Sequence, residues 1–264
     1  MKIIDASVQE IKQAPGLMGI YQHIERCGRT CYKSEDKITE DSAKDFFKRL
    51  VNRKHYAMLE HGTVYLKIPY YYNKFIDSKY SFTKEVDGLL YVTTNMRVLI
   101  EEYPNDYEDI IKKYALEEPD VNNIKRVTAH FIISRGIANE FVRHRVFSFA
   151  QESTRYCNYC KDKFDGELTF IKPEWLKGRE YESSFLLWIE SMSRAEFEYK
   201  NLCSRHSSPQ DARGVLPLDL KTELIMTGTT DQWEGFFDLR MREVSGPAHP
   251  DAKAIATKWY NIIK

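Results

Sequence analysis

The sequence predicts a mixed α/β fold of the α+β type, in which a largely antiparallel sheet is flanked by helices. Segments with the two-residue alternation of half-buried strands are interspersed irregularly with segments of helical spacing. No regular βαβ alternation demands a parallel sheet. Internal repeats, low-complexity segments and Pro/Gly-rich linkers are absent from the 264 residues, so we expect a single domain over residues 1–264.

Two elements can be placed in the first half of the chain. Asp41 or Ser42 can cap a helix whose apolar residues between 46 and 51 recur at helical spacing. Residues 64–69 alternate as a half-buried strand that ends at a proline. Residues of about 70–123 are rich in Tyr and mixed charge, and no element can be placed within them from the sequence.

The middle of the chain predicts a strand and three helices. Residues 127–133 alternate as a strand, after which Ser134 can cap a short helix. The clearest helix follows, because apolar residues recur at three-four spacing over residues 181–202. Ser208 and the proline after it then predict a short helix that ends at Gly214.

The C-terminal part begins with an ambiguous segment. Residues 218–226 alternate as a strand, although residues 223–226 would also suit a helix. Thr229 and Gln232 form a capping-box pattern at the start of the next helix. Residues 252–263 complete a final amphipathic helix.

Composition narrows the class of protein. Lys plus Arg and Asp plus Glu both number 39, and this balance argues against a general nucleic-acid binder. No apolar run reaches the roughly 18 residues of a membrane span, and the N-terminus lacks the apolar stretch of a secretory signal. Five cysteines are an odd, sparse set that suits reduced thiols. We expect a soluble, cytoplasmic protein without nucleic-acid or membrane partners.

The densest cluster of chemistry-bearing residues lies between Glu140 and Tyr156. Arg143, His144 and Arg145 are consecutive, and further Ser, Thr and Arg residues follow them. Adjacent helical residues point about 100° apart, so at a helix end these cations can fan towards different phosphates or rings. The alternative is a basic surface turn, but the flanking aromatic residues argue against full exposure.

Other candidates are weaker. Cys157 and Cys160 have metal or redox spacing, but no second pair lies at a zinc-finger distance, and we expect no metal site. His55 precedes a strand and can be structural or catalytic. Arg240 lies on a helix among aromatic residues, where it can pair with Asp238 or Glu243 or bind a ligand. Neither a Gly-x-Gly-x-x-Gly loop nor a P-loop occurs.

At these residues the chain resembles the flavin-dependent thymidylate synthases. Their signature is Arg-His-Arg, two residues, Ser, four residues, Ser, one residue and Arg. Here it is matched by Arg143, His144, Arg145, Ser148, Ser153 and Arg155. Further segments are similar to the family in the same order along the chain, namely Arg29–Tyr32, His55–His61, Ala212–Pro217 and Trp233–Arg240.

The resemblance implies a reaction and its reactants. It implies reductive methylation of dUMP to dTMP, with 5,10-methylenetetrahydrofolate as carbon donor and FAD reduced by NADPH as hydride source. It also implies a homotetramer whose active sites are shared between subunits. Which reductant is preferred, and which subunit supplies each residue, stay open.

The resemblance also assigns residues. Catalytic roles are implied for Arg240, which would face the pyrimidine and stabilise developing negative charge, and for His55, near flavin and folate. Contacts to FAD are implied for Arg143, His144, Arg145, Gln151, His55, Thr229 and Asp231. Contacts to the nucleotide are implied for Glu140, Arg143, Gln151, Glu152, Ser153, Thr154, Arg155, Arg213 and Arg240.

Residues of about 70–123 look longer than the matching part of compact family members, so we expect an enlarged middle segment there. Three positions depart from the family pattern. Ala150 and Gln151 stand where many members have Asn and Glu, and Ala57 replaces a common Thr. Three rival functions remain. They are a nucleic-acid module stacking bases on Phe147, Phe149 and Tyr156, a zinc-stabilised interaction protein, and another flavoenzyme acting on a pyrimidine nucleotide.

Overall fold

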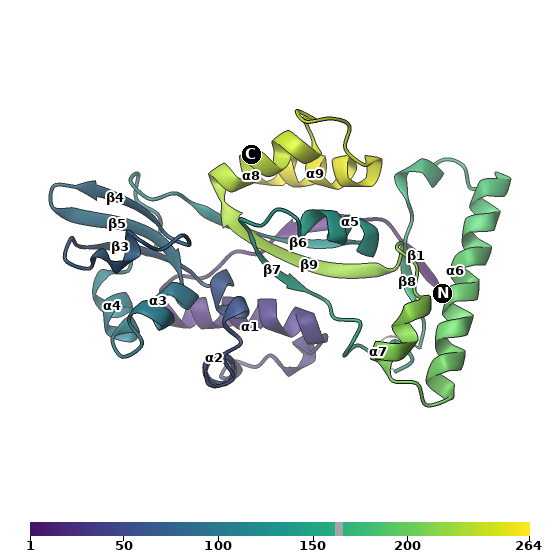
Figure 1. Ribbon diagram of the computed structural model, residues 1–264, viewed down its shortest axis with the longest axis horizontal. Coiled ribbons are helices and arrows are strands. Elements are labelled where there is room, and N and C mark those ends of the chain that lie inside the picture. The colour runs from purple at the N-terminus through teal and green to yellow at the C-terminus, as the bar shows by residue number, and fades with distance from the viewer. Residues whose placement is uncertain (162–165) are drawn as a thin grey trace.

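A four-stranded antiparallel sheet lies at the centre of the molecule (Figure 1). The computed structural model describes residues 1–161 and 166–264. In spatial order the strands are β2 (Ser7–Glu10), β6 (Arg126–Ser134), β9 (Lys221–Thr229) and β7 (Ser148–Gln151). The predicted strands at 127–133 and 218–226 are β6 and β9, so the helical alternative for residues 223–226 is wrong.

Helices cover both faces of this sheet (Figure 1). One face carries α5 (Arg135–Phe141), α8 (Thr230–Arg240) and α9 (Pro250–Ile263), and the opposite face carries α1 (Gly16–Tyr32). Alternation along β9 separates the two faces. Leu224 and Met226 join the aromatic core under α5, α8 and α9, whereas Ile225 packs with Cys27 of α1.

Most predicted helices are present. Helix α2 is Ser42–Asn52, α6 is Ser183–Ser204 and α7 is Pro209–Ala212. The side chain of Ser134 caps α5, and Thr229 and Gln232 form the predicted capping box of α8. Helix α6 begins two residues after Tyr181, which is fully exposed, so that residue was wrongly assigned to the apolar stripe. Helix α1 is absent from the predicted elements.

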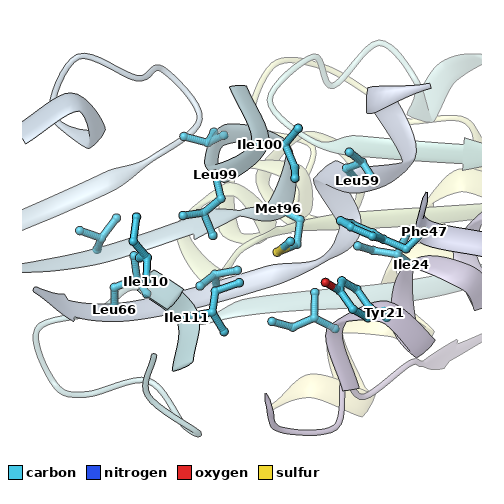
Figure 2. Packing of buried hydrophobic residues seen from close by; sticks show 14 of the residues in the cluster. Tyr21, Ile24, Phe47, Leu59, Leu66, Met96, Leu99, Ile100, Ile110 and Ile111 are labelled. Carbon is cyan, nitrogen blue, oxygen red and sulfur yellow. The ribbon is translucent and has the colours of Figure 1, made fainter. Parts of the chain in front are cut away.

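Residues 70–123 form much of a second core. Strand β3 (Thr63–Pro69) pairs with β5 (Leu89–Asn95), which pairs with β4 (Phe82–Val86). Helices α3 (Met96–Glu102) and α4 (Tyr107–Tyr114) follow. Figure 2 shows the result, in which Met96, Leu99 and Ile111 meet side chains of α1 and α2 in one apolar cluster. Residues 70–123 therefore pack against the N-terminal half of α1.

A parallel pair and the short helices complete the fold. Strand β1 (Lys2–Ile4) pairs in parallel with β8 (Thr169–Ile171), beside α6 (Figure 1). Short 3₁₀ segments are Glu35–Lys37, Tyr56–His61, Asn73–Phe75, Glu174–Leu176 and Arg213–Val215. The expected fold class is confirmed, since the larger sheets are antiparallel and flanked by helices. Among the described helices, none combines the length and hydrophobicity that a membrane crossing requires.

A buried polar chain crosses the α1 side of the central sheet. His23 of α1 bonds the Thr128 hydroxyl at 3.2 Å, which meets the Thr227 hydroxyl at 2.8 Å. Thr227 bonds Nδ1 of His61 at 2.8 Å. Burial lowers the pKa of His23 to about 4 and that of His61 to about 3. Both rings are therefore neutral at neutral pH.

We predict that acid destabilises the protein through these two rings. In the unfolded chain a histidine titrates near pH 6.5. Below that pH both histidines bind protons in the unfolded chain but not in the folded chain. The free energy of unfolding therefore falls as pH drops from about 6.5 towards 4. Each ring contributes a slope of up to about 1.4 kcal/mol per pH unit. Urea unfolding at a series of pH values between 7.5 and 5 measures this change in the free energy of unfolding.

His61→Asn is the informative variant, because an amide can still bond Thr227 but does not titrate. Its slope should be smaller than that of the wild type by about one proton. His206→Asn, at an exposed position, is the matched control and should keep the full slope. Equal slopes in His61→Asn and wild type would show that the buried His61 ring does not contribute to the pH dependence of stability.

Candidate functional site

The turn between α5 and β7 places the three consecutive basic residues in different environments. Phe141 and Phe147 are buried at its two ends. The Phe147 ring lies so close to Gly228 of β9 that any Cβ there would collide with it. Between these anchors Arg143 and Arg145 are exposed, whereas His144 turns inwards. The side chains of these three residues thus point in different directions because they lie on a turn between two buried aromatic side chains.

His144, Arg240 and Glu140 form one hydrogen-bonded group. Arg240 Nε donates to His144 Nε2 at 3.0 Å, and its Nη1 donates to the Glu140 carboxylate at 2.7 Å. Its Nη2 donates to the Glu140 carbonyl at 3.1 Å. Asp238 and Glu243, the local partners considered from the sequence, instead pair with Arg242 and Lys253.

The protonation of His144 is set by this group. Burial, reinforced by the Arg240 charge, lowers the pKa of His144 to about 4. The ring is therefore neutral at neutral pH and its Nε2 accepts the hydrogen bond, which assigns the remaining proton to Nδ1. Three hydrogen bonds fix the orientation of the Arg240 guanidinium, and its side chain is 19% exposed. A cation held in this way can stabilise an anionic group or polarise a carbonyl group.

Gln151 and Ser153 lie where β7 ends beside α1. The Ser153 amide donates to the Cys31 carbonyl at 2.9 Å, which fastens the chain to the last turn of α1. Gln151 alternates with Ala150, which packs on the α1 side, so its position belongs to the face that carries α5 and Arg240. Its Nε2 is buried without a hydrogen-bond partner among the described residues. A donor is therefore available beside the Arg240 face.

Glu152 points into the protein interior. Its side chain is completely buried, and it accepts hydrogen bonds from Tyr159 and from Lys221, each at 2.9 Å. Lys221 also bonds Glu223, which Lys33 and His130 bond as well. These cations and hydrogen bonds hold the pKa of Glu223 far below its usual range despite burial. Glu152 thus anchors the backbone between Gln151 and Ser153.

Lys33, His130, Lys221 and Glu223 are absent from the predicted site. One signal was present in the sequence, because Lys221 and Glu223 stand two apart on a strand and share a face. That face lies on the α1 side, where Lys33 follows the last turn of α1. The pairing of residues 190 positions apart could not be deduced from spacing.

Thr154 and Arg213 meet at a small cavity. Arg213 Nη1 donates to the Thr154 hydroxyl at 3.4 Å. The cavity has a volume of about 240 Å³ and is bordered by α5 and the segment 213–218. Arg155 next to it is exposed, with its guanidinium 5.5 Å from the Tyr156 ring centre. Neither arginine forms an ion pair within the described part of the chain.

His55 borders a second, more apolar cavity. Its volume is about 380 Å³, and Tyr32, Phe46, Leu50 and Met58 contribute to its wall. Ala57 also lines it and offers no side-chain hydrogen bond. His55 itself is exposed. The cavity therefore suits a flat, largely apolar group whose polar edge lies at Lys54 and His55.

Thr229 and Asp231 lie at the opposite end of α8 from Arg240. The Thr229 hydroxyl accepts from the Gln232 amide and is buried, and Asp231 is exposed in the first turn. An 11-residue helix is about 16 Å long, so these residues lie far from the Arg240 group. Cys157 is buried and Cys160 partly buried. Within residues 1–161 and 166–264, no group of three potential metal ligands occurs.

Comparison with known proteins identifies the family. Residues 108–264 match the Thy1 family, described as thymidylate synthase complementing protein. The chain belongs to this family. The resemblance drawn from the segment Arg143–Tyr156, which lies inside the matched region, is thereby confirmed.

Two of the curated relatives are named flavin-dependent thymidylate synthase. The one from Pyrococcus furiosus is 37% identical over 112 residues, which are 42% of this chain and 43% of the relative. The one from Pyrococcus horikoshii is 35% identical over 145 residues, which are 53% and 57% of the two chains. The chain thus spans about half the length of the curated relatives that it matches.

One solved structure is similar over nearly the full length. It is a UMP/dUMP methylase from Streptomyces cacaoi bound with 5-Br dUMP. The similarity covers 99% of this chain and 93% of that chain, at 15% identity. Its TM-score of 0.45 is too low to support a functional conclusion.

We predict that Lys221→Met destabilises the protein by about 3–5 kcal/mol, because it leaves the Glu152 carboxylate buried without a cation. The double variant Lys221→Met/Glu152→Leu should recover much of this loss, since the unpaired charge is then gone. Urea unfolding at pH 7 measures both.

Lys112→Met is the matched control, because Lys112 is 62% exposed and its ion pairs are solvated. It should change stability little. If Lys221→Met were no more costly than this control, Glu152 would not depend on Lys221.

Proposed function

We propose that the protein is a flavin-dependent thymidylate synthase, which methylates dUMP at C5 to give dTMP. The carbon donor would be 5,10-methylenetetrahydrofolate, and FAD reduced by NADPH would supply the hydride. Family membership and the names of the curated relatives support this proposal. The observation that carries it is Arg240, a cation held by Glu140 and neutral His144 on the face that Gln151 also occupies.

Arg240 would act on the pyrimidine ring. Methylation at C5 requires negative charge to develop on the ring nitrogen or carbonyl oxygens, and a fixed guanidinium stabilises that charge without reorganising. Glu140 would orient Arg240 and approach the nucleotide. The orphaned amide of Gln151 would supply a further donor.

The nucleotide phosphate would bind at the other end of the segment. Ser153 and Thr154 offer hydroxyls, and Arg155 and Arg213 offer guanidinium forks without carboxylate partners among the described residues. Glu152 would contribute by fixing the backbone that presents these groups, since its own carboxylate is bonded inside the protein.

The residues present fit a flavin in three respects. Arg143 and Arg145 are exposed cations suited to a diphosphate, the apolar cavity beside His55 suits a flat ring, and Gln151 carries an unused buried donor. Asp231 is accessible, whereas the hydroxyl of Thr229 already caps α8. His144 would orient Arg240 and approach the cofactor beside it. When bound, FAD supplies the redox chemistry.

We also propose a cytoplasmic homotetramer. The outer side of α6 supports an oligomer, because Leu186, Leu187 and Phe197 are 62%, 64% and 56% exposed on it. The separation of the Arg240 group, the His55 cavity and Thr229 along the fold is also consistent with sites completed by a second subunit.

The nucleic-acid alternative is less well supported. Stacking on this segment would require accessible rings, but Phe147 is buried and Phe149 packs on the aromatic core. Tyr156 is exposed beside Tyr32, but it is the one accessible ring of the three that were expected to stack bases.

The decisive experiment is an anaerobic assay with dUMP, methylenetetrahydrofolate, FAD and NADPH, in which dTMP is followed by chromatography. Product that disappears when FAD is omitted from apoprotein would support the proposal. Absence of dTMP from a folded, FAD-containing protein would contradict it and direct the search to other pyrimidine nucleotides.

We predict that Arg240→Ala lowers kcat by about 10²–10³-fold while FAD remains bound, because it removes one preorganised donor from the reacting ring. Arg242→Ala is the control, since Arg242 pairs with Asp238 and Glu234 on the exposed side of α8. Turnover of dUMP and the flavin absorbance of both variants measure the effect. Unchanged turnover in Arg240→Ala would remove Arg240 from the reaction.

A further inference from the structure

The 240 Å³ cavity beside Thr154 contains a residue that the sequence motif does not include. Besides Thr154 and Arg213, it is lined by Arg135 and Asn139 of α5 and by Leu216 and Leu218. Arg135 and Asn139 are four apart on a helix and therefore share one side of it. The cavity thus has a cationic wall on α5 opposite Arg213.

Arg135 carries an unsatisfied donor. Its Nη1 is fully buried, and no described residue accepts a hydrogen bond from it. Leaving a buried charged donor without a partner costs more than the net gain of an ordinary hydrogen bond, so such groups are rare in native structures. The Glu152 carboxylate accepts its hydrogen bonds from Tyr159 and Lys221. Arg135 also lines the cavity, so an acceptor bound there would meet the side chain of a cation that has no carboxylate partner among the described residues.

The size and lining of the cavity restrict that acceptor. Pockets that enclose a whole drug-sized ligand usually exceed about 300 Å³, so this cavity fits a group rather than an entire nucleotide. Two guanidinium groups and a hydroxyl converge on it, without a carboxylate in its described lining. This set matches a phosphate monoester, which carries about two negative charges and several acceptor oxygens.

We propose that Arg135 is a further phosphate ligand of the enzyme, binding the monoester group of the nucleotide together with Arg213 and Thr154. Asn139, exposed at the cavity, supplies an additional amide donor. This inference rests on the proposed function for the identity of the nucleotide. The anion site itself rests on the residues that line the cavity, and on the unsatisfied donor of one of them, Arg135.

The test compares wild type, Arg135→Gln and Arg135→Lys by calorimetric titration with dUMP, deoxyuridine and inorganic phosphate. Arg135→Gln should weaken dUMP binding by about 10–100-fold, the range for a charge-assisted hydrogen bond, and should leave deoxyuridine affinity unchanged. The dUMP affinity of Arg135→Lys should lie between those of the wild type and Arg135→Gln, because lysine keeps the charge but lacks the bidentate guanidinium. Arg205→Gln, at an exposed residue outside the cavity, should bind as the wild type does.

Thermal unfolding separates ligand binding from a structural role. Inorganic phosphate should raise the Tm of the wild type and not that of Arg135→Gln. Without ligand, Arg135→Gln should be as stable as the wild type or more so, because no hydrogen bond of Arg135 Nη1 is lost. A lower Tm with unchanged phosphate binding would make Arg135 structural and overturn the proposal.

Failure of this inference and failure of the proposed function give different results. If the wild type methylates dUMP and Arg135→Gln binds it equally well, the Arg135 assignment is wrong and the function stands. If phosphate binds in an Arg135-dependent way but dUMP is not methylated, the anion site stands and the function is wrong. A wild type that binds neither dUMP nor phosphate overturns the inference.

Discussion

Strands β6 and β9 pair over nine residues, from Arg126 opposite Thr229 to Ser134 opposite Lys221. Each strand ends in a hydroxyl residue that caps the next helix, Ser134 for α5 and Thr229 for α8. Because the strands are antiparallel, these helices start at opposite ends of the sheet and run back across the same face. The last residues of α8 thereby reach the last turn of α5, where Arg240 meets Glu140 and His144. Loss of this register would separate these groups.

The two faces of the same sheet serve different purposes. On the α5 side the aromatic core holds the turn that carries Arg143 and Arg145. On the α1 side the strands carry the histidine–threonine chain and the ion network around Glu223. Buried ion pairs contribute little net stability, but removing one partner is costly, so they specify which segments must meet. Here they fasten the coil after β7 to both α1 and β9, and Ser153, Thr154 and Arg155 follow that anchor directly.

Local signals predicted most of the fold around the site. The caps at Ser134 and Thr229 and the alternation in β6 and β9 depend on neighbouring residues, so the sequence alone was sufficient. The Asp87-Gly88 hairpin turn, with φ of 52° and 73°, has an equally clear local signal, since Asp-Gly is favoured in two-residue hairpin turns. The partner of Arg240 could not be found this way. Acidic residues two or three positions away were the obvious choices, yet Glu140 lies 100 residues earlier in the chain. Likewise, only the packed structure distinguishes the interior Glu152 from its accessible neighbours.

The distribution of arginines explains how a chain of zero net charge can bind anions. Arg29, Arg97 and Arg242 are neutralised by carboxylates elsewhere on the fold. Around the candidate site Arg143, Arg145, Arg155 and Arg213 lack such partners among the described residues, and Arg135 has a buried donor with none. Fixed unpaired cations concentrate positive potential locally, and the surrounding acidic residues limit its extent. A field of this kind attracts a small dianion and gives little attraction to a long polyanion, which favours a mononucleotide as the ligand.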